Sequence, residues 1–326
     1  MEDRKDLSES TWVDLKLMSI EATNSHLLYA NGLQQVELLV RVLGIDANGH
    51  DEAISDEELQ SLELFDARGT DIEITLQKVQ DSYSYKNDPE VEYKGWGWGY
   101  RRNAEILPLS ATGDAPPSPT PATSTHERRV KIYLHTRTAQ PLHLGFRITQ
   151  QGGDVFHSGD MAGGVARLLS IPPKVYSPAH YTFRHDHRRT ELNASGNEVD
   201  FICYTLSLFE NGARIEFLPD FTVPGQVGML DLGKDIQQVG TYAGTSLSGG
   251  HEFHTYIERA HLPRVPASVK RSGDIPLVLG WQTPLKRIGD HFASLQPIFF
   301  KTVDHYGNAH NIGVSFTEDK QALKLT

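Results

Sequence analysis

Residues 29–49 read YANGLQQVELLVRVLGIDANG, and this stretch decides the fold class. Within residues 36–43 every second residue is Val or Leu, which is the period of a β-strand with one buried face. The pairs Asn31-Gly32 and Asn48-Gly49 on either side tolerate the positive φ angles of tight turns. The stretch therefore predicts a strand between two turns.

This stretch resembles the bacterial immunoglobulin-like repeats of the invasin and intimin type. The likeness is carried by residues 29–32 (YANG), the alternating strand 36–43 and residues 44–49 (GIDANG). The chain departs from those repeats in the acidic helix expected near Glu57 and in having no proline soon after Gly49. The resemblance implies a β-sandwich and no particular activity, because such modules serve as spacers, adhesins and docking units.

Working outward, short apolar or alternating runs recur along the whole chain. They predict strands at residues 12–18, 72–76, 130–135, 142–148, 181–187, 200–209, 213–217, 253–260, 275–281, 297–303 and 312–316. We expect 142–148 to pair with 130–135. One short helix is expected near residues 55–65, where Ser55 and Glu58 have the spacing of a capping box. The fold class predicted is all-β, with tandem β-sandwich domains, the first of them immunoglobulin-like.

A proline-rich stretch at residues 110–129 interrupts the strands. It reads SATGDAPPSPTPATSTHERR and has no aliphatic residue larger than Ala, so it buries too little apolar surface to offset the entropy of ordering. We interpret it as a spacer. The domains expected are an immunoglobulin-like sandwich at 1–109, the spacer at 110–129, and a larger β-sandwich region at 130–326 that could contain two subdomains, 130–218 and 251–326.

Composition restricts the class of protein. The net charge is −11, and residues 1–108 carry 22 acidic against 10 basic side chains, which disfavours a nucleic-acid partner. Cys203 is the single cysteine, so no internal disulfide forms. No run approaches the ~18 apolar residues of a membrane span. The charged residues 1–6 lack the apolar core of a signal peptide, so we expect synthesis in a cytoplasm, with any release or injection by a non-classical route.

An aromatic row follows at residues 93–100, YKGWGWGY. On a strand, Trp96, Trp98 and Tyr100 share one face, and glycines occupy the other. The row fits the core face of a strand, a contact between domains or subunits, or a platform on which a sugar or another flat ligand stacks. It is the candidate ligand-binding site, and a protein or carbohydrate is the candidate partner.

The candidate metal site is His185, His187 and Glu191. On a strand the two imidazoles share a face, and the order His-x-His-x(3)-Glu resembles the first motif of the cupins. The glycines of that motif are replaced by Ala179 and Glu198, and no second motif follows, so surface histidines explain the pattern as well. We expect no cofactor, with a divalent metal as the alternative.

Histidines are concentrated late in the chain. His26 and His50 precede the proline-rich stretch, and the other thirteen of the 15 histidines lie within or after it. Histidines gathered at an interface would loosen it on acidification, whereas scattered surface histidines would not.

The function expected by elimination is binding or structure. The chain has no GxxxxGK[ST] phosphate loop and no GxSxG nucleophile elbow. We therefore expect a non-enzymatic bacterial or phage-type protein, on a surface, in a virion or released, that could form an oligomer. The alternatives are a cupin-like metal-dependent enzyme and a pH-responsive toxin or membrane-active β-protein.

Overall fold

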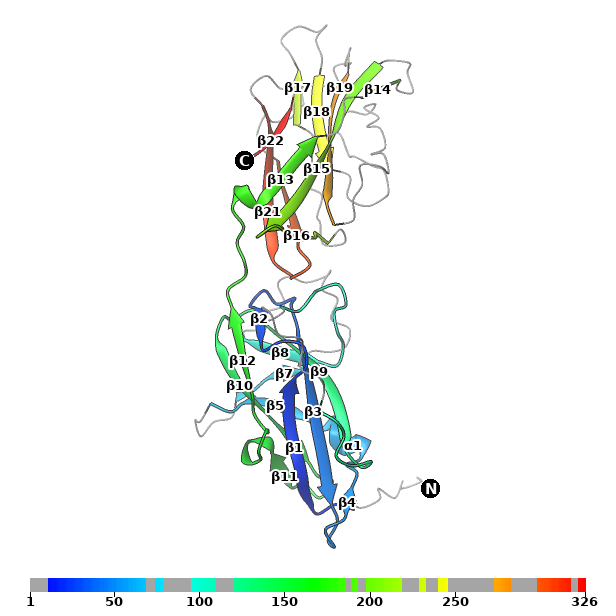
Figure 1. Cartoon of the computed structure of the whole chain (residues 1–326), viewed down its shortest axis with the longest axis vertical. Coiled ribbons are helices and arrows are strands. Elements are labelled where there is room, and N and C mark those ends of the chain that lie inside the picture. The colour runs from blue at the N-terminus through cyan, green and yellow to red at the C-terminus, as the bar shows by residue number, and fades with distance from the viewer. Residues whose placement is uncertain are drawn as a thin grey trace, which may run out of the picture. The chain divides into compact units, whose positions relative to one another are not determined.

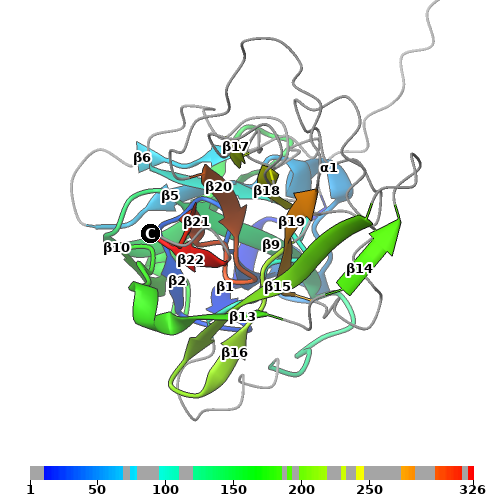
Figure 2. The same cartoon turned by 90° about the horizontal axis from the view of Figure 1, so that it is seen from above.

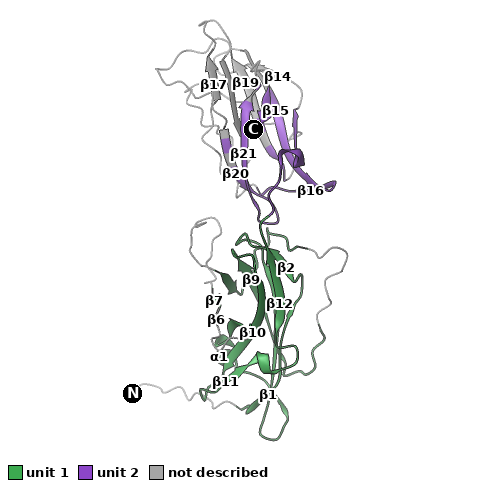
Figure 3. Ribbon diagram, turned by 90° about the vertical axis from the view of Figure 1, so that its left-hand side faces the viewer, with its two compact units in different colours: residues 1–173 green, residues 174–326 purple. Residues whose placement is uncertain are grey.

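The computed structural model describes residues 11–68, 74–78, 95–109, 120–185, 189–192, 198–218, 229–232, 240–245, 273–282, 298–317 and 322–326. The strand expected at 253–260 and the candidate ligand His187 lie outside them. The chain divides into two compact units, Met1–Pro173 and Lys174–Thr326, which are coloured separately in Figure 3. The described secondary structure is almost entirely β, which confirms the prediction of an all-β fold.

Two six-stranded sheets make up the described part of unit 1 (Figure 1). The first has the order β1-β3-β9-β8-β7, with β4 also beside β3, and the second has the order β2-β12-β10-β5-β6, with β11 beside β10. The strands of the first sheet are β1 (Asp14–Ala22), β3 (Val36–Ile45), β4 (Asp51–Glu52), β7 (Gln77–Lys78), β8 (Trp96–Gly99) and β9 (Arg128–Thr136). Those of the second are β2 (Leu27–Tyr29), β5 (Glu63–Asp66), β6 (Ile74–Thr75), β10 (Pro141–Thr149), β11 (Val155–His157) and β12 (Ala166–Ile171).

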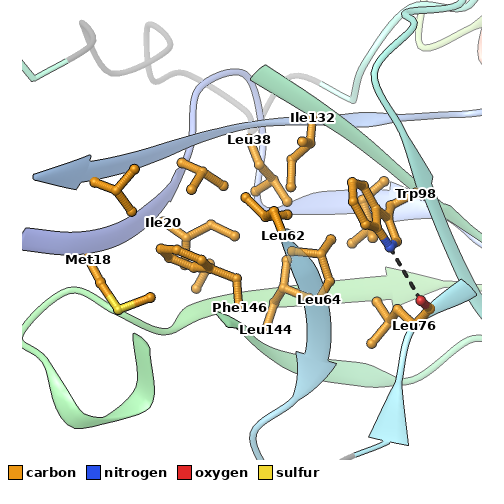
Figure 4. Packing of buried hydrophobic residues seen from close by; sticks show 14 of the residues in the cluster. Met18, Ile20, Leu38, Leu62, Leu64, Leu76, Trp98, Ile132, Leu144 and Phe146 are labelled. Carbon is orange, nitrogen blue, oxygen red and sulfur yellow. Dashed lines mark hydrogen bonds between the residues drawn. The ribbon is translucent and has the colours of Figure 1, made fainter. Parts of the chain in front are cut away.

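One hydrophobic core lies between these two sheets, as Figure 4 shows. Leu38 and Ile132 come from the first sheet, Leu64, Leu144 and Phe146 come from the second, and all five side chains are fully buried. Alternate residues of each strand face this core, as the period of two in the sequence predicts. Unit 1 is therefore a β-sandwich.

The expected domain boundary at residues 110–129 is wrong. β9, which follows the proline-rich stretch, lies between β3 and β8 of the first sheet and pairs with both. β10 and β12 supply the second sheet. The stretch is therefore a connection within unit 1, and the boundary between units falls at Pro173 and Lys174.

Successive strands of unit 1 often belong to different sheets, and at two such connections this differs from the expected pairing. β9 and β10 were expected to pair, yet they belong to different sheets whose inner faces share the core. Similarly, the turn at Asn31-Gly32, with φ of 77° at Gly32, leads from β2 in the second sheet to β3 in the first. The turn at residues 46–49, with φ of 82° at Gly49, does form the expected hairpin, between β3 and β4.

The helix expected near residues 55–65 is present only as α1 (Asp56–Gln60), because Glu63–Asp66 form strand β5 instead. Ser55 and Glu58 form the complete capping box that their spacing predicts. The carboxylate of Glu58 is buried and also accepts bonds from the Trp12 indole at 2.9 Å and the Gln151 amide at 3.2 Å. It thus joins the start of β1, the helix and the β10–β11 turn.

At the sheet edge formed by β2, side chains bind backbone amides. Leu27 N donates to Ser25 Oγ at 2.9 Å, and Tyr29 N donates to Gln34 Oε1 at 2.6 Å. Both Ser25 and Gln34 are buried. These amides are therefore not open for pairing with another strand.

In its described residues, unit 2 also has two sheets and one core. The described strands form a seven-stranded sheet, β13-β15-β19-β18-β17 with β14 and β16 also beside β15, and a three-stranded sheet, β20-β21-β22. β13 and β14 follow one another along β15 (Figure 2). The strands are β13 (Tyr181–His185), β14 (Arg189–Leu192), β15 (Glu198–Glu210), β16 (Ala213–Ile215), β17 (Met229–Leu232), β18 (Gly240–Thr245), β19 (Ile275–Gln282), β20 (Ile298–Val303), β21 (Ala309–Phe316) and β22 (Leu323–Leu325). The described residues also contain two short 3₁₀ helices, η1 (Ser158–Asp160) in unit 1 and η2 (Pro178–His180) in unit 2.

The suggested subdomains 130–218 and 251–326 are not separate in the described residues. β19, from the second of these ranges, pairs with β15, from the first, over eight residues. The core joins Leu206 and Leu208 of β15 to Leu277 of β19 and to Ile312 and Val314 of β21. Residues 174–326 are accordingly one sandwich-like unit.

Candidate functional site

The aromatic row at residues 96–100 lies in the core of unit 1. Trp96 and Trp98 are only 7% and 1% exposed, and Trp98 Nε1 donates to the carbonyl oxygen of Leu76 at 3.3 Å (Figure 4). Tyr100 is half-buried and packs edge-on against Trp98, with 5.6 Å between ring centroids. The structure therefore shows the core arrangement, and neither tryptophan offers an open ring face for stacking a sugar.

The candidate metal ligands are separated by the strand register. His185 pairs with Tyr204, whereas Glu191 pairs with Val199, five positions away along β15. Five residues of strand span about 17 Å, and an odd separation places the two positions on opposite faces of the sheet. The register thus argues against one ion shared by His185 and Glu191. Among the described residues, no group of three or more His, Cys, Asp or Glu side chains is placed to hold a metal ion.

A cluster that contains none of the candidate residues predicted from the sequence lies at one end of unit 2. Residues 304–308 connect β20 to β21, and the cluster consists of Asp304, Asn308 and His310 with Tyr176 and Tyr181. Asp304 and Asn308 are fully buried and His310 is 4% exposed. We call it the Asp304 cluster.

The Asp304 cluster has the chain Asp–His–Tyr at its centre. His310 Nε2 lies 3.3 Å from Asp304 Oδ2, and His310 Nδ1 lies 2.8 Å from the Tyr181 hydroxyl. Because a carboxylate only accepts, Nε2 donates to Asp304, and in the neutral imidazole Nδ1 accepts from the phenol. This order of groups is the one that activates a nucleophile in hydrolases.

Two observations argue that the hydrogen-bonded series of Asp304, His310 and Tyr181 has a structural role. Burial, followed by the nearby Asp304 charge, raises the pKa of Tyr181 to about 12, so its phenol stays protonated at neutral pH. The Asp304 carboxylate also accepts from the backbone amides of Tyr306, at 2.8 Å, and Asn308, at 3.0 Å. A carboxylate so engaged holds the turn in place and is poorly placed to drive proton transfer.

The Asp304 cluster ties the start of unit 2 to its core. Lys174 N donates to Asn308 Oδ1 at 3.0 Å. The ring of Tyr176 stacks on His310, with 5.3 Å between centroids, and meets His180 edge-on at 5.6 Å. Histidines do therefore gather here. The sequence signal was the spacing of Asp, Gly, Asn and His in DHYGNAH at residues 304–310, which marks a side-chain-bonded turn but not its partners.

A second buried polar group lies in unit 1. Arg41 of β3 donates to both carboxylate oxygens of Glu127, at 2.8 and 3.0 Å, and to the carbonyl oxygen of Pro121 at 3.2 Å. Glu127 also accepts from Thr123 and Arg129. The bond with Arg41 lowers the pKa of Glu127 far below its usual value, although burial opposes this shift. This Arg41–Glu127 pair fixes the end of the proline-rich stretch onto the sheet.

Comparison with models of protein families and with curated proteins finds no match for this chain. The helices in the described part of the chain lack the length and apolar character needed to cross a membrane.

Proposed function

We propose that this is a non-enzymatic binding or structural protein of bacterial or phage type, placed on a surface or in a virion, or released. One observation carries the proposal: the buried carboxylates of Asp304, Glu58 and Glu127 each accept several hydrogen bonds. Such groups hold loops in position and leave little capacity for proton transfer or metal binding. A protein or carbohydrate is the partner that we propose.

The immunoglobulin-like character of unit 1 is part of this proposal. Its support is the likeness of residues 29–49 to the invasin and intimin repeats, together with a core between two sheets. Unit 1 needs β9 to β12 to complete its sheets, so any relationship to those repeats would include residues up to 173.

The full chain, immobilised, can be tested against glycan arrays and intact bacterial cells. We expect saturable binding with the ligand recovered unchanged. Tyr181→Phe should bind equally well, because it removes only a hydroxyl that we assign to structure. Chemical conversion of a bound ligand that is lost in folded Tyr181→Phe would refute the proposal and identify the Asp304 cluster as catalytic.

A pH-responsive protein remains the second candidate. The gathering of His180 and His310 around Tyr176 supports it. Acid-dependent leakage of dye from anionic lipid vesicles would favour this candidate over a pH-independent binding protein.

A further inference from the structure

The two sheets of unit 2 are joined by a short segment of backbone next to the Asp304 cluster. Residues 216–218 follow β16 of the seven-stranded sheet, and residues 303–305 end β20 and begin the turn of the three-stranded sheet. Leu218 N donates to Val303 O at 2.8 Å, and His305 N donates to Glu216 O at 2.8 Å. Phe217 and Asp304 form a β-bridge between them. We call these residues the joint.

The imidazole of His305 closes the joint with a bond of its own. Its Nδ1 accepts from the backbone amide of Glu216 at 3.4 Å. Its Nε2 is shielded from solvent and has no hydrogen-bond partner within the described residues. The ring also packs edge-on against Tyr306, with 4.3 Å between centroids.

These contacts suit a neutral ring and not a charged one. An imidazolium has two N–H donors and no acceptor. Protonation of Nδ1 would set one donor against the Glu216 amide, and the buried Nε2–H would carry positive charge without an acceptor. The hydrogen bond that the Glu216 amide donates to His305 Nδ1 is therefore lost when the ring becomes charged.

We propose that His305 is an acid-sensitive latch that holds the two sheets of unit 2 together at neutral pH and releases the joint when it is protonated. The inference goes beyond the proposed binding role, because it concerns regulation of unit 2 and needs no partner. Its consequence is exposure of apolar surface, since Phe217 at the joint is 2% exposed and packs edge-on against His310 at 5.2 Å.

The charges around His305 determine the direction of the response. Asp304 lies on its own turn and Glu216 lies across the joint, and both favour the charged ring. Arg214 lies 3.9 Å from Glu216 and pairs with Asp274 at 2.8 Å, so the joint also carries a positive charge. Burial outweighs the two carboxylates and lowers the pKa of His305 below its usual 6.5. The opened state therefore takes up the proton more readily, and opening becomes more favourable as pH falls below about 6.5.

Hydrogen exchange of the full chain, read by mass spectrometry at pH 7 and pH 5 and corrected for intrinsic rates, tests the latch. We expect peptides that cover residues 214–218 and 303–308 to lose protection at pH 5. In His305→Asn, whose Oδ1 can accept the Glu216 amide but does not titrate, that loss should disappear. His180→Asn is the matched control, because His180 is half-buried, hydrogen-bonds to Ser177 and lies outside the joint, and it should keep the wild-type response in these peptides.

Equal protection of the wild type at both pH values would overturn the proposal, as would an undiminished acid response in His305→Asn. If the joint of His305→Asn already lacks protection at pH 7, the ring ¹⁵N chemical shifts of His305 in the wild type provide the test instead. Titration of this ring below pH 6.5 supports the latch, and titration at or above pH 6.5 refutes it. These readings require no ligand, so they remain informative even if the proposed binding function fails.

Discussion

Glu127→Gln tests whether the end of the proline-rich stretch is part of unit 1. The side chains of Glu127 and Arg41 are 0% and 7% exposed, so the pair is shielded from water. The substitution keeps the size of the side chain, removes its charge and places an amide N–H₂ among the donors of Arg41, Thr123 and Arg129.

Breaking a buried ion pair by changing one partner typically costs about 3–5 kcal/mol, because the other charge is left uncompensated. Here Glu21 also attracts Arg41, which reduces the penalty. We therefore expect a loss of about 3 kcal/mol in the free energy of unfolding, at the lower end of that range. Since the pKa of Glu127 is depressed, the contribution of the pair is complete above about pH 4.5 and is lost only as pH falls further.

Equilibrium urea unfolding of the full chain, followed by tryptophan fluorescence, measures this loss, because three of the four tryptophans belong to unit 1. Lys131→Ala is the control. Lys131 of β9 pairs with Glu37 of β3 but is 61% exposed, so its loss should cost less than about 1 kcal/mol. If Glu127→Gln costs no more than Lys131→Ala, the reasoning about the buried pair is refuted.

Four further predictions concern the core, a buried histidine, the proline-rich stretch and metal. Trp98→Ala should cost about 3–5 kcal/mol in urea unfolding and Tyr100→Ala clearly less, because only Trp98 is fully buried; equal costs would contradict the assigned packing. Burial, aided by Arg137, lowers the pKa of His135 to about 4, so unit 1 should lose up to about 3 kcal/mol as pH falls from 6.5 to 4, and His135→Leu should flatten this dependence in urea titrations. After proteolytic cleavage within residues 110–119, the two fragments should elute together in size-exclusion chromatography, whereas separate elution would restore the expected boundary. Chelator should leave the melting temperature of wild type and of His185→Ala unchanged, and a decrease in wild type alone would support the metal site.

Local features of the fold could be predicted from the sequence. Alternation in residues 36–43 and the Asn-Gly pair at 48–49 predicted β3 and its hairpin, and Ser55 with Glu58 predicted α1. These features depend on a few neighbouring residues, whose backbone preferences and side-chain bonds act over one turn or one strand.

The assignment of strands to sheets could not be predicted in the same way. β9 and β10 are adjacent in the chain and both alternate, yet nothing in either pattern shows that each packs across the core from the other. The prolines at positions 116, 117, 119 and 121 indicate that this part of residues 110–129 is not a strand, although residues 128 and 129 begin β9. The proline-rich composition carries no information on whether β8 and β9, on either side, pair with one another.

The arrangement of the candidate sites could not be predicted from the sequence for a related reason. Glycines behind Trp96 and Trp98 suggested an approachable surface, but burial is decided by the opposing sheet, which the local sequence does not show. His185 and Glu191 looked close because they are only six positions apart in the chain, whereas the register on β15 holds them apart. The Asp304 cluster was missed because Tyr181 and His310 are 129 residues apart in the chain.

The central place of β9 in the first sheet has a consequence for how the protein is made. While the ribosome has produced only residues 1–109, β3 and β8 have no strand between them, and β2 and β5 lack the β10 and β12 strands that complete their sheet. The apolar faces of Leu38 and Trp98 then have too few partners to bury. Unit 1 can therefore complete its two sheets only after β12, which ends close to Pro173, has been synthesised. We expect it to fold during synthesis in one late step. A first domain that folds as soon as the proline-rich stretch has been made is not expected.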